Sequence, residues 1–79
     1  MLTFQNQTFK PVSADTWADY CSTFPCYATE RTMPESDIPA LVVIATNRPT
    51  KPWELTAPVG TILGIVTYKN NTPQHFIRM

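Results

Sequence analysis

The sequence predicts an α+β domain in which a small antiparallel sheet of four or five strands carries one amphipathic helix on one face. Three observations predict this class. They are an uncharged apolar run in the middle of the chain, one segment with helical spacing of aromatic residues, and asparagine or proline residues where strands should turn or end. The 79 residues have the size of one domain, which we expect to cover residues 1–79.

Residues 2–12 predict two short strands. Apolar and polar residues alternate on both sides of the polar positions 5–7, and Asn6 accepts the left-handed conformation that a tight turn requires. One continuous strand through the same residues is the alternative interpretation. Pro11 has no N–H for a ladder hydrogen bond, so it indicates an edge position or the end of a strand.

The next segment is the one convincing helix in the sequence. Ser13 offers the hydroxyl of an N-cap, Asp15 is well placed toward the positive end of the helix dipole, and Pro25 ends the segment. We expect one apolar face to pack on the sheet, because its residues follow at spacings of three, four and seven: Trp17, Tyr20, Cys21 and Phe24.

The middle of the chain is predicted to hold the strand around which the domain packs. Residues 26–38 lack a regular pattern and are interpreted as a polar loop, with a short strand at 27–32 as the alternative. Residues 39–46 then form an uncharged, apolar run that is rich in β-branched residues. So short a run favours a strand covered on both faces over a helix.

Residues 60–79 predict a hairpin. The strand at 60–69 has two fairly apolar faces, and Gly64 within it indicates a bulge or a close approach of the helix. Asn70 and Asn71 form a suitable two-residue turn, because asparagine accepts positive φ. The strand at 72–79 then returns, and Pro73 near its start indicates an edge.

The segment at residues 47–59 is the most promising functional feature. Pro49, Pro52 and Pro58 exclude regular helix and interior strand and push their preceding residues toward extended conformations. This stiff loop brings together the residues that we predict to bind a partner: Arg48, Lys51, Trp53 and Glu54.

Trp53 has two interpretations, which separate the functional hypotheses. A large aromatic side chain can fold back as a lid on one end of the core. Exposed on a rigid loop beside arginine, it has instead the composition of a protein-binding hot spot, where little conformational entropy is lost on docking.

The sequence does not indicate catalytic chemistry. Cys21 and Cys26 are spaced more widely than the Cys-x-x-Cys of redox and zinc sites, and His75 is the single histidine. The two glycines of the chain do not form a phosphate-binding loop that leads into a helix. We therefore expect a protein that is not an enzyme and that has no catalytic residue, no metal and no cofactor, with unreactive buried thiols.

Size and charge indicate a binding role. Such a short chain leaves apolar surface exposed, which favours an inhibitor or accessory factor that docks on a larger protein. The alternatives are a weak single-strand nucleic-acid binder that uses the cations and aromatic residues of the C-terminal half, and a homodimer formed by strand edges. Net charge is zero, which removes the simplest argument for nucleic acid or an anionic membrane surface.

Location and origin are also predicted from these features. The N-terminal residues lack the pattern of a signal peptide, and no apolar run approaches the roughly 20 residues that cross a bilayer. We therefore expect a cytoplasmic protein without membrane contact. A short, neutral chain without a catalytic signature is similar in general character to small accessory proteins of phages and mobile elements.

Overall fold

The computed structural model describes residues 1–33, 36–46, 48 and 51–79, and this part contains six strands and one helix. The helix α1 (Ala14–Ser22) connects the second strand to the third. The strands form one antiparallel sheet of order β1-β2-β6-β5-β4-β3, and they are β1 (Leu2–Phe4), β2 (Gln7–Val12), β3 (Cys26–Arg31), β4 (Ala40–Ala45), β5 (Ile62–Lys69) and β6 (Thr72–Arg78).

The predicted class is confirmed in outline, as a small antiparallel sheet with one helix, but the predicted count of four or five strands is wrong. The additional strand is β3, which lies in the segment interpreted as a polar loop and agrees with the alternative of a short strand at 27–32. Its register runs from Cys26 opposite Ala45 to Arg31 opposite Ala40. Backbone pairing with an apolar neighbour therefore makes a strand from residues that carry little strand pattern of their own.

Two hairpin turns follow the local prediction. Gln5 and Asn6 have φ values of 50° and 64°, and Asn70 and Asn71 have φ values of 52° and 63°. Positive φ at both central residues is the geometry of the tight turn that suits the twist of paired strands. The prediction of two short strands joined at Asn6 is confirmed, and so is the hairpin at Asn70.

The prolines lie where a strand has a neighbour on one side alone. Pro11 pairs with Phe76 of β6, beyond the stretch of β2 that pairs with β1. Pro73 pairs with Tyr68 of β5, before the stretch of β6 that pairs with β2. Neither β2 nor β6 is an edge strand of the whole sheet, so the predicted edge character is local to these positions.

The helix is capped and oriented as its sequence predicts. The Oγ of Ser13 accepts a hydrogen bond from the backbone N–H of Thr16 at 3.2 Å. The helix ends at Ser22, with Thr23 as the C-cap, so it stops before Pro25. Its apolar side packs on the sheet in a core cluster with Leu63, Val43 and Ala45, through the predicted residues Trp17, Tyr20, Cys21 and Phe24.

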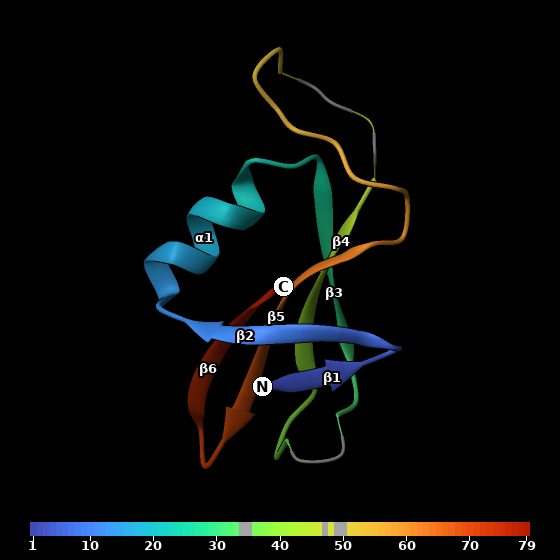
Figure 1. Ribbon diagram of the computed structural model, residues 1–79. Helices are drawn as coiled ribbons and strands as arrows, with labels where there is room; N and C mark the ends of the chain where they lie inside the picture. The colour runs from blue at the N-terminus through green and yellow to red at the C-terminus, as the bar shows by residue number, and fades with distance from the viewer. Residues whose placement is uncertain (34–35, 47, 49–50) are drawn as a thin grey trace.

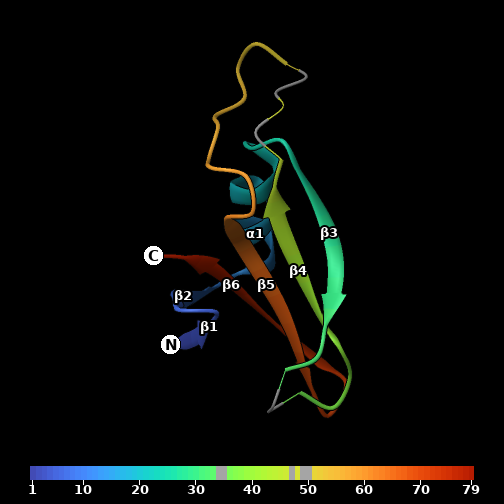
Figure 2. The same ribbon diagram turned by 90° about the vertical axis from the view of Figure 1, so that its right-hand side faces the viewer.

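Both faces of the sheet are covered, which differs from the predicted single helix-covered face. The helix contacts β6 and β5 on one side of the sheet. The opposite side has its own core of Phe9, Val42 and Ile65, against which Leu2 and Phe4 pack. The β1–β2 hairpin runs across the direction of β3, β4 and β5 and lies on one side of them (Figures 1 and 2), so the curved sheet folds over its own inner face.

β4 is apolar on both faces, as the sequence predicts, but it is not the middle strand of the sheet. Val42 belongs to the core inside the curved sheet and Val43 to the core beneath the helix. β4 lies second from the edge, between β5 and β3. The two strands in the middle of the sheet are β6 and β5, and residues Ile62 to Val66 of β5 are all buried.

Both features predicted for Gly64 are present, a β-bulge beside it and a close approach of the helix. Val43 lies opposite Gly64 while Ile44 lies opposite Ile62, so Leu63 is an additional residue in a β-bulge. A Cβ at Gly64 would lie 2.7 Å from Nε1 of Trp17 and 2.8 Å from Sγ of Cys21. The helix therefore approaches the sheet most closely where the strand has no side chain.

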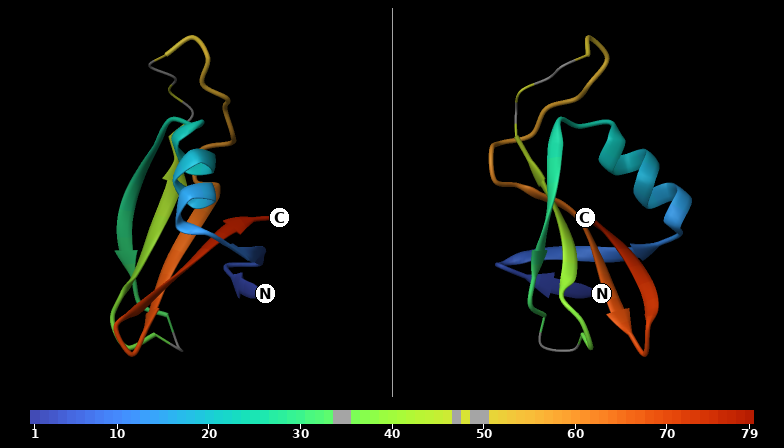
Figure 3. Two further views of the ribbon diagram at one scale, coloured as in Figure 1. Left: turned by 90° about the vertical axis from the view of Figure 1, so that its left-hand side faces the viewer. Right: turned by 180° about the vertical axis from the view of Figure 1, so that it is seen from behind.

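The long connection between β4 and β5 projects past the ends of β3 and β4, as both views of Figure 3 show. At its base Ala45 N–H donates to the carbonyl of Thr61 at 2.9 Å, and Gly60 N–H donates to the carbonyl of Ala45 at 3.1 Å. Within the described residues, no helix is long and apolar enough to cross a membrane.

Candidate functional site

The projecting connection is anchored to the domain on the side that leads to β5. The backbone N–H of Leu55 donates to the carbonyl of Thr23, at the end of the helix, at 2.8 Å. Ala57 is buried in the core beneath the helix. The described part of the connection is thus held by backbone and core contacts, while its larger side chains remain outside.

Trp53 is exposed to solvent over 70% of its surface, so the interpretation as a lid on the core is wrong. The Nζ of Lys51 lies 5.8 Å from the centroid of the Trp53 ring, within the range of a cation–π contact. Lys51 N–H donates to Oε1 of Glu54 at 3.1 Å, and Glu54 N–H donates to the carbonyl of Lys51 at 3.2 Å. These bonds close a short turn that brings three of the four predicted residues together.

Arg48, the fourth predicted residue, is exposed and lies at a different part of the connection. It lines a pocket of about 290 Å³ at the junction of the connection with β3 and β4, together with Tyr27, Ile44, Ala45, Thr46, Val59 and Gly60. The structure therefore places the predicted residues in two groups, the Lys51 turn and the pocket that contains Arg48.

Three apolar residues at this end of the molecule were missed by sequence reasoning. Val59 is 73% exposed, Leu55 is 59% exposed and Tyr27 is 51% exposed. Leu55 and Val59 belong to the same proline-containing segment, and their apolar character between polar neighbours was a usable signal. Tyr27 had no such signal, because its exposure depends on β3 being an edge strand.

The hydrogen bonds between β3 and β4 determine which backbone groups of β3 are left unpaired at its free edge. Thr46 N–H donates to the carbonyl of Pro25 at 2.9 Å, which extends the ladder between β4 and β3 by one position. In an antiparallel ladder these bonded positions alternate, so Tyr27 and Thr29 direct their backbone groups to β4. Cys26 and Ala28 then direct theirs away from the sheet, where β3 has no neighbouring strand within the described sheet.

The two thiols have environments that disfavour the thiolate. Burial, together with the neighbouring Cys26, raises the pKa of Cys21 from 9.0 to about 12. Burial and the charge of Glu54 raise the pKa of Cys26. The Sγ of Cys26 donates to the carbonyl of Cys21 at 3.5 Å. A nucleophilic cysteine needs a lowered pKa, so these shifts support the prediction of unreactive thiols. The prediction that both thiols are buried holds for Cys21, whereas Cys26 is half-buried.

His75, the single histidine, packs against the helix. Its ring packs edge-on against Trp17, with the centroids 5.6 Å apart. Among the residues whose structure is described, no group of three or more histidine, cysteine or acidic side chains is arranged to hold a metal ion.

The cations of the C-terminal half are spread over the molecule. The Nε of Arg78 donates to Oη of Tyr20 at 2.7 Å, and its guanidinium lies 5.5 Å from the Phe24 ring centroid, so this residue ties β6 to the helix. Lys69 ends β5 at the β5–β6 turn, at the opposite end of the molecule from the projecting connection (Figure 1). This distribution does not form one basic track of the kind that follows a phosphate backbone.

No protein-family model, no curated protein and no solved structure matches this chain. The functional interpretation therefore rests on the geometry described above.

Proposed function

We propose that this chain is a small, non-catalytic protein-binding domain that acts as an inhibitor or accessory factor on a larger protein. Its docking surface, here called the loop site, consists of Tyr27, Arg48, Lys51, Trp53, Glu54, Leu55 and Val59. The observation that carries the proposal is the 70% exposure of Trp53 on a connection whose base is anchored to the domain.

Exposed apolar side chains at one end of a small domain favour an interface. Trp53, Leu55 and Val59 are each more than half exposed within one short segment. Apolar patches that remain in contact with water on a monomer often mark a binding surface. Tryptophan is enriched among residues that contribute most to binding, and an anchored loop loses little conformational entropy on docking.

The edge of β3 supplies a second element of recognition. Cys26 and Ala28 present backbone N–H and C=O groups beside the loop site, and no charge lies on the strand from Cys26 to Thr29. An extended segment of the partner that pairs with this edge would gain main-chain hydrogen bonds. Its alternate side chains would then face Tyr27 and the pocket that contains Arg48.

The test is a capture experiment followed by an affinity measurement. The wild-type domain, an Arg48→Ala/Trp53→Ala variant and a control Lys10→Ala/Met79→Ala variant are used as baits in lysate of the native host, with and without nuclease. We expect a protein that resists nuclease and is retained by the wild type and the control but not by the loop-site variant. Lys10 and Met79 are exposed and lie outside the loop site, and the control removes one positive charge and one exposed apolar side chain, as the loop-site variant does.

The purified partner then allows the contribution of each element to be measured. Trp53→Ala is expected to weaken binding by about thirtyfold or more, which corresponds to about 2 kcal/mol for a hot-spot residue. Ala28→Pro blocks the outward N–H of β3 and should also weaken binding if the partner pairs with this edge. Equal affinity of all variants would contradict the proposal.

The two alternatives have separate signatures in the same samples. A signal lost to nuclease would favour nucleic acid. A homodimer through β3 would be seen as a molar mass that rises with concentration in light scattering, and Ala28→Pro would abolish that rise.

A further inference from the structure

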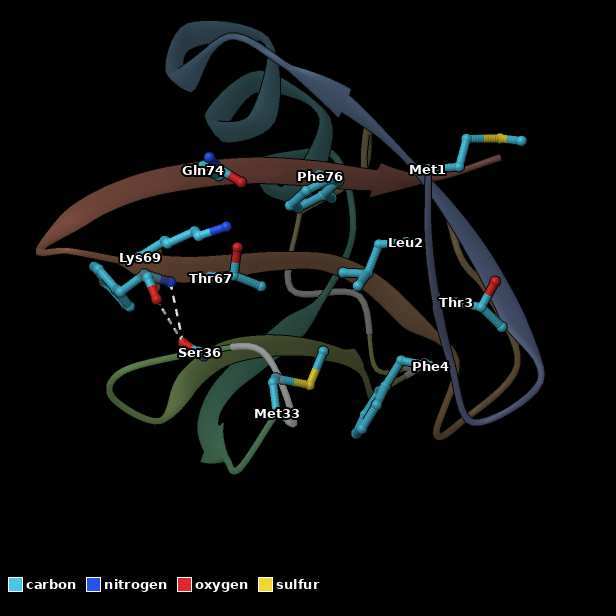
Figure 4. Close-up of a pocket in the computed structure, with 11 residues that line it drawn as sticks. Met1, Leu2, Thr3, Phe4, Met33, Ser36, Thr67, Lys69, Gln74 and Phe76 are labelled. Atoms are coloured by element: carbon cyan, nitrogen blue, oxygen red, sulfur yellow. Dashed lines mark hydrogen bonds between the residues drawn. The ribbon is translucent and has the colours of Figure 1, made fainter.

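A second pocket, distant from the loop site, opens on the inner side of the curved sheet. It measures about 420 Å³ and is bounded by β1, by the described residues of the β3–β4 connection, and by the β5–β6 hairpin (Figure 4). This volume lies within the usual range for small-molecule pockets, about 300 to 1,000 Å³.

One part of the pocket is apolar and adaptable. Leu2 and Phe4 reach in from β1, and Phe76 lies across from them on β6 (Figure 4). Met33 lines the same space and is itself buried in the core of the inner face. An unbranched methionine adjusts its shape easily, so this part suits an apolar body of variable outline.

The other part is polar and carries a positive charge. Thr67 and Lys69 on β5 and Gln74 on β6 lie along one wall, where Thr67 is directly opposite Gln74 in the strand register. Within the described residues, none of these three side chains has a hydrogen-bond or ion-pair partner. They therefore supply an ammonium, an amide N–H and a hydroxyl to whatever occupies the pocket.

The β5–β6 hairpin that carries these groups is hydrogen-bonded to the β3–β4 connection. Ser36 donates through its hydroxyl to the carbonyl of Tyr68 at 2.9 Å and accepts from Tyr68 N–H at 3.2 Å, which ties the β3–β4 connection to β5. Asp37 accepts a hydrogen bond from Asn70 N–H in the hairpin turn. The described residues that line the pocket include no acidic side chain, and Lys69 is the one lysine or arginine among them.

We propose that this pocket binds a small amphipathic monocarboxylate, whose apolar body contacts Leu2, Phe4, Met33 and Phe76 and whose carboxylate is held by Lys69 and Gln74. A carboxylate fits because it accepts charge-assisted hydrogen bonds from an ammonium and an amide together. The two-sided lining, apolar on β1 and cationic on the hairpin, selects against molecules that lack either part. The proposal is independent of the loop site.

The test uses sodium octanoate as the probe, with octanol as the neutral analogue of the same length. Backbone amide signals of the ¹⁵N-labelled domain are followed by NMR during titration to about 20 mM. We expect octanoate to shift the signals of Thr67, Lys69, Gln74 and Phe76 with a dissociation constant in the millimolar range, as is usual for so small a ligand. A parallel titration with 3-phenylpropionate shows whether an aliphatic or an aromatic body fits better.

Three variants with conservative shapes test the role of charge. Lys69→Met removes the ammonium and Gln74→Glu adds a carboxylate to the wall, while Lys10→Met removes an exposed cation that does not line the pocket. Lys69→Met and Gln74→Glu should each weaken octanoate binding about tenfold and leave octanol binding unchanged. Lys10→Met should bind octanoate like the wild type. The dispersion of the amide signals reports whether each variant is folded.

Several results would overturn the proposal. Octanoate that causes no shifts at the pocket up to 20 mM excludes the site. Equal binding of octanoate and octanol, unaffected by Lys69→Met, shows that the carboxylate is not recognised. An equal loss of octanoate binding in Lys10→Met shows that general surface charge is responsible.

Discussion

At the scale of single residues, Trp17 is the one in the described part of the chain whose side chain buries a polar atom without a hydrogen-bond partner. Its Nε1 has no hydrogen-bond partner among the described atoms, although the indole packs over Gly64 and against His75. A buried donor without a partner opposes folding by roughly 1–3 kcal/mol. Packing of the indole on the sheet contributes apolar burial that offsets this cost.

Cys21 is the residue from which a pH dependence follows. Its pKa is about 12 in the folded domain and 9.0 in an unfolded chain, so the unfolded chain releases the proton first. The stabilising contribution of the neutral thiol is therefore complete below pH 9 and declines as the pH rises toward 12.

We expect the free energy of unfolding, measured by urea denaturation, to fall more steeply above pH 9 in the wild type than in Cys21→Ala. The difference in slope should be at most about 1.4 kcal/mol per pH unit, the value for one proton. Identical slopes for the two proteins would mean that the Cys21 thiol does not titrate differently on unfolding.

At the scale of secondary-structure elements, the contact between helix α1 and strand β5 depends on the bulge. Leu63 and Gly64 are consecutive, yet Leu63 packs in the core beneath the helix and Gly64 lies under Trp17 and Cys21 of the same helix. A regular strand would place these two residues on opposite faces. The bulge thus turns both residues toward the helix, so that Leu63 contacts it with a large side chain and Gly64 leaves room for Trp17 and Cys21.

Gly64→Ala is predicted to destabilise the domain by about 1–3 kcal/mol, the usual range for overpacking. The added methyl group would meet Nε1 of Trp17, Sγ of Cys21 and the carbonyl oxygen of Phe76, which is 3.2 Å away and belongs to the backbone. The measurement is urea denaturation of both proteins. In a Trp17→Ala background the cost should be smaller because one obstacle is gone, and an unchanged cost would show that Trp17 is not the residue in conflict.

At the scale of the whole molecule, the residues that form the two cores and the exposed residues proposed to bind a partner lie in different parts of the domain. The two cores lie beneath the helix and inside the curved sheet, and Ala57 is the described residue of the projecting connection that enters either of them. Trp53 belongs to neither core. The end of the molecule proposed for binding can consequently change without disturbing the packing that holds the sheet.

Trp53→Ala is accordingly expected to shift the melting temperature by less than about 4 °C, because exposed substitutions usually change stability by no more than about 0.5 kcal/mol. Circular dichroism during thermal unfolding measures this shift. A much larger loss would place Trp53 in a supporting contact and would weaken its assignment to the loop site.

Local residue chemistry was sufficient to predict much of the architecture. The cap at Ser13, the turns at Asn6 and Asn70 and the two-faced strand β4 all follow from the preferences of a few neighbouring residues. These features involve short-range hydrogen bonds and side-chain periodicity, which are properties of contiguous sequence. The prediction of a partner-binding segment with Arg48, Lys51, Trp53 and Glu54 came from the same kind of local evidence, the prolines of residues 47–59.

Pairing between distant segments decided the rest. The edge position of β3, the exposure of Tyr27 and the placement of Trp53 outside both cores depend on which strands become neighbours. The inner pocket joins residues from the first strand, the β3–β4 connection and the last hairpin, which no local pattern connects. Strand order and register depend on the packing of both faces of the sheet at once, and for this reason they emerge only when the chain is folded.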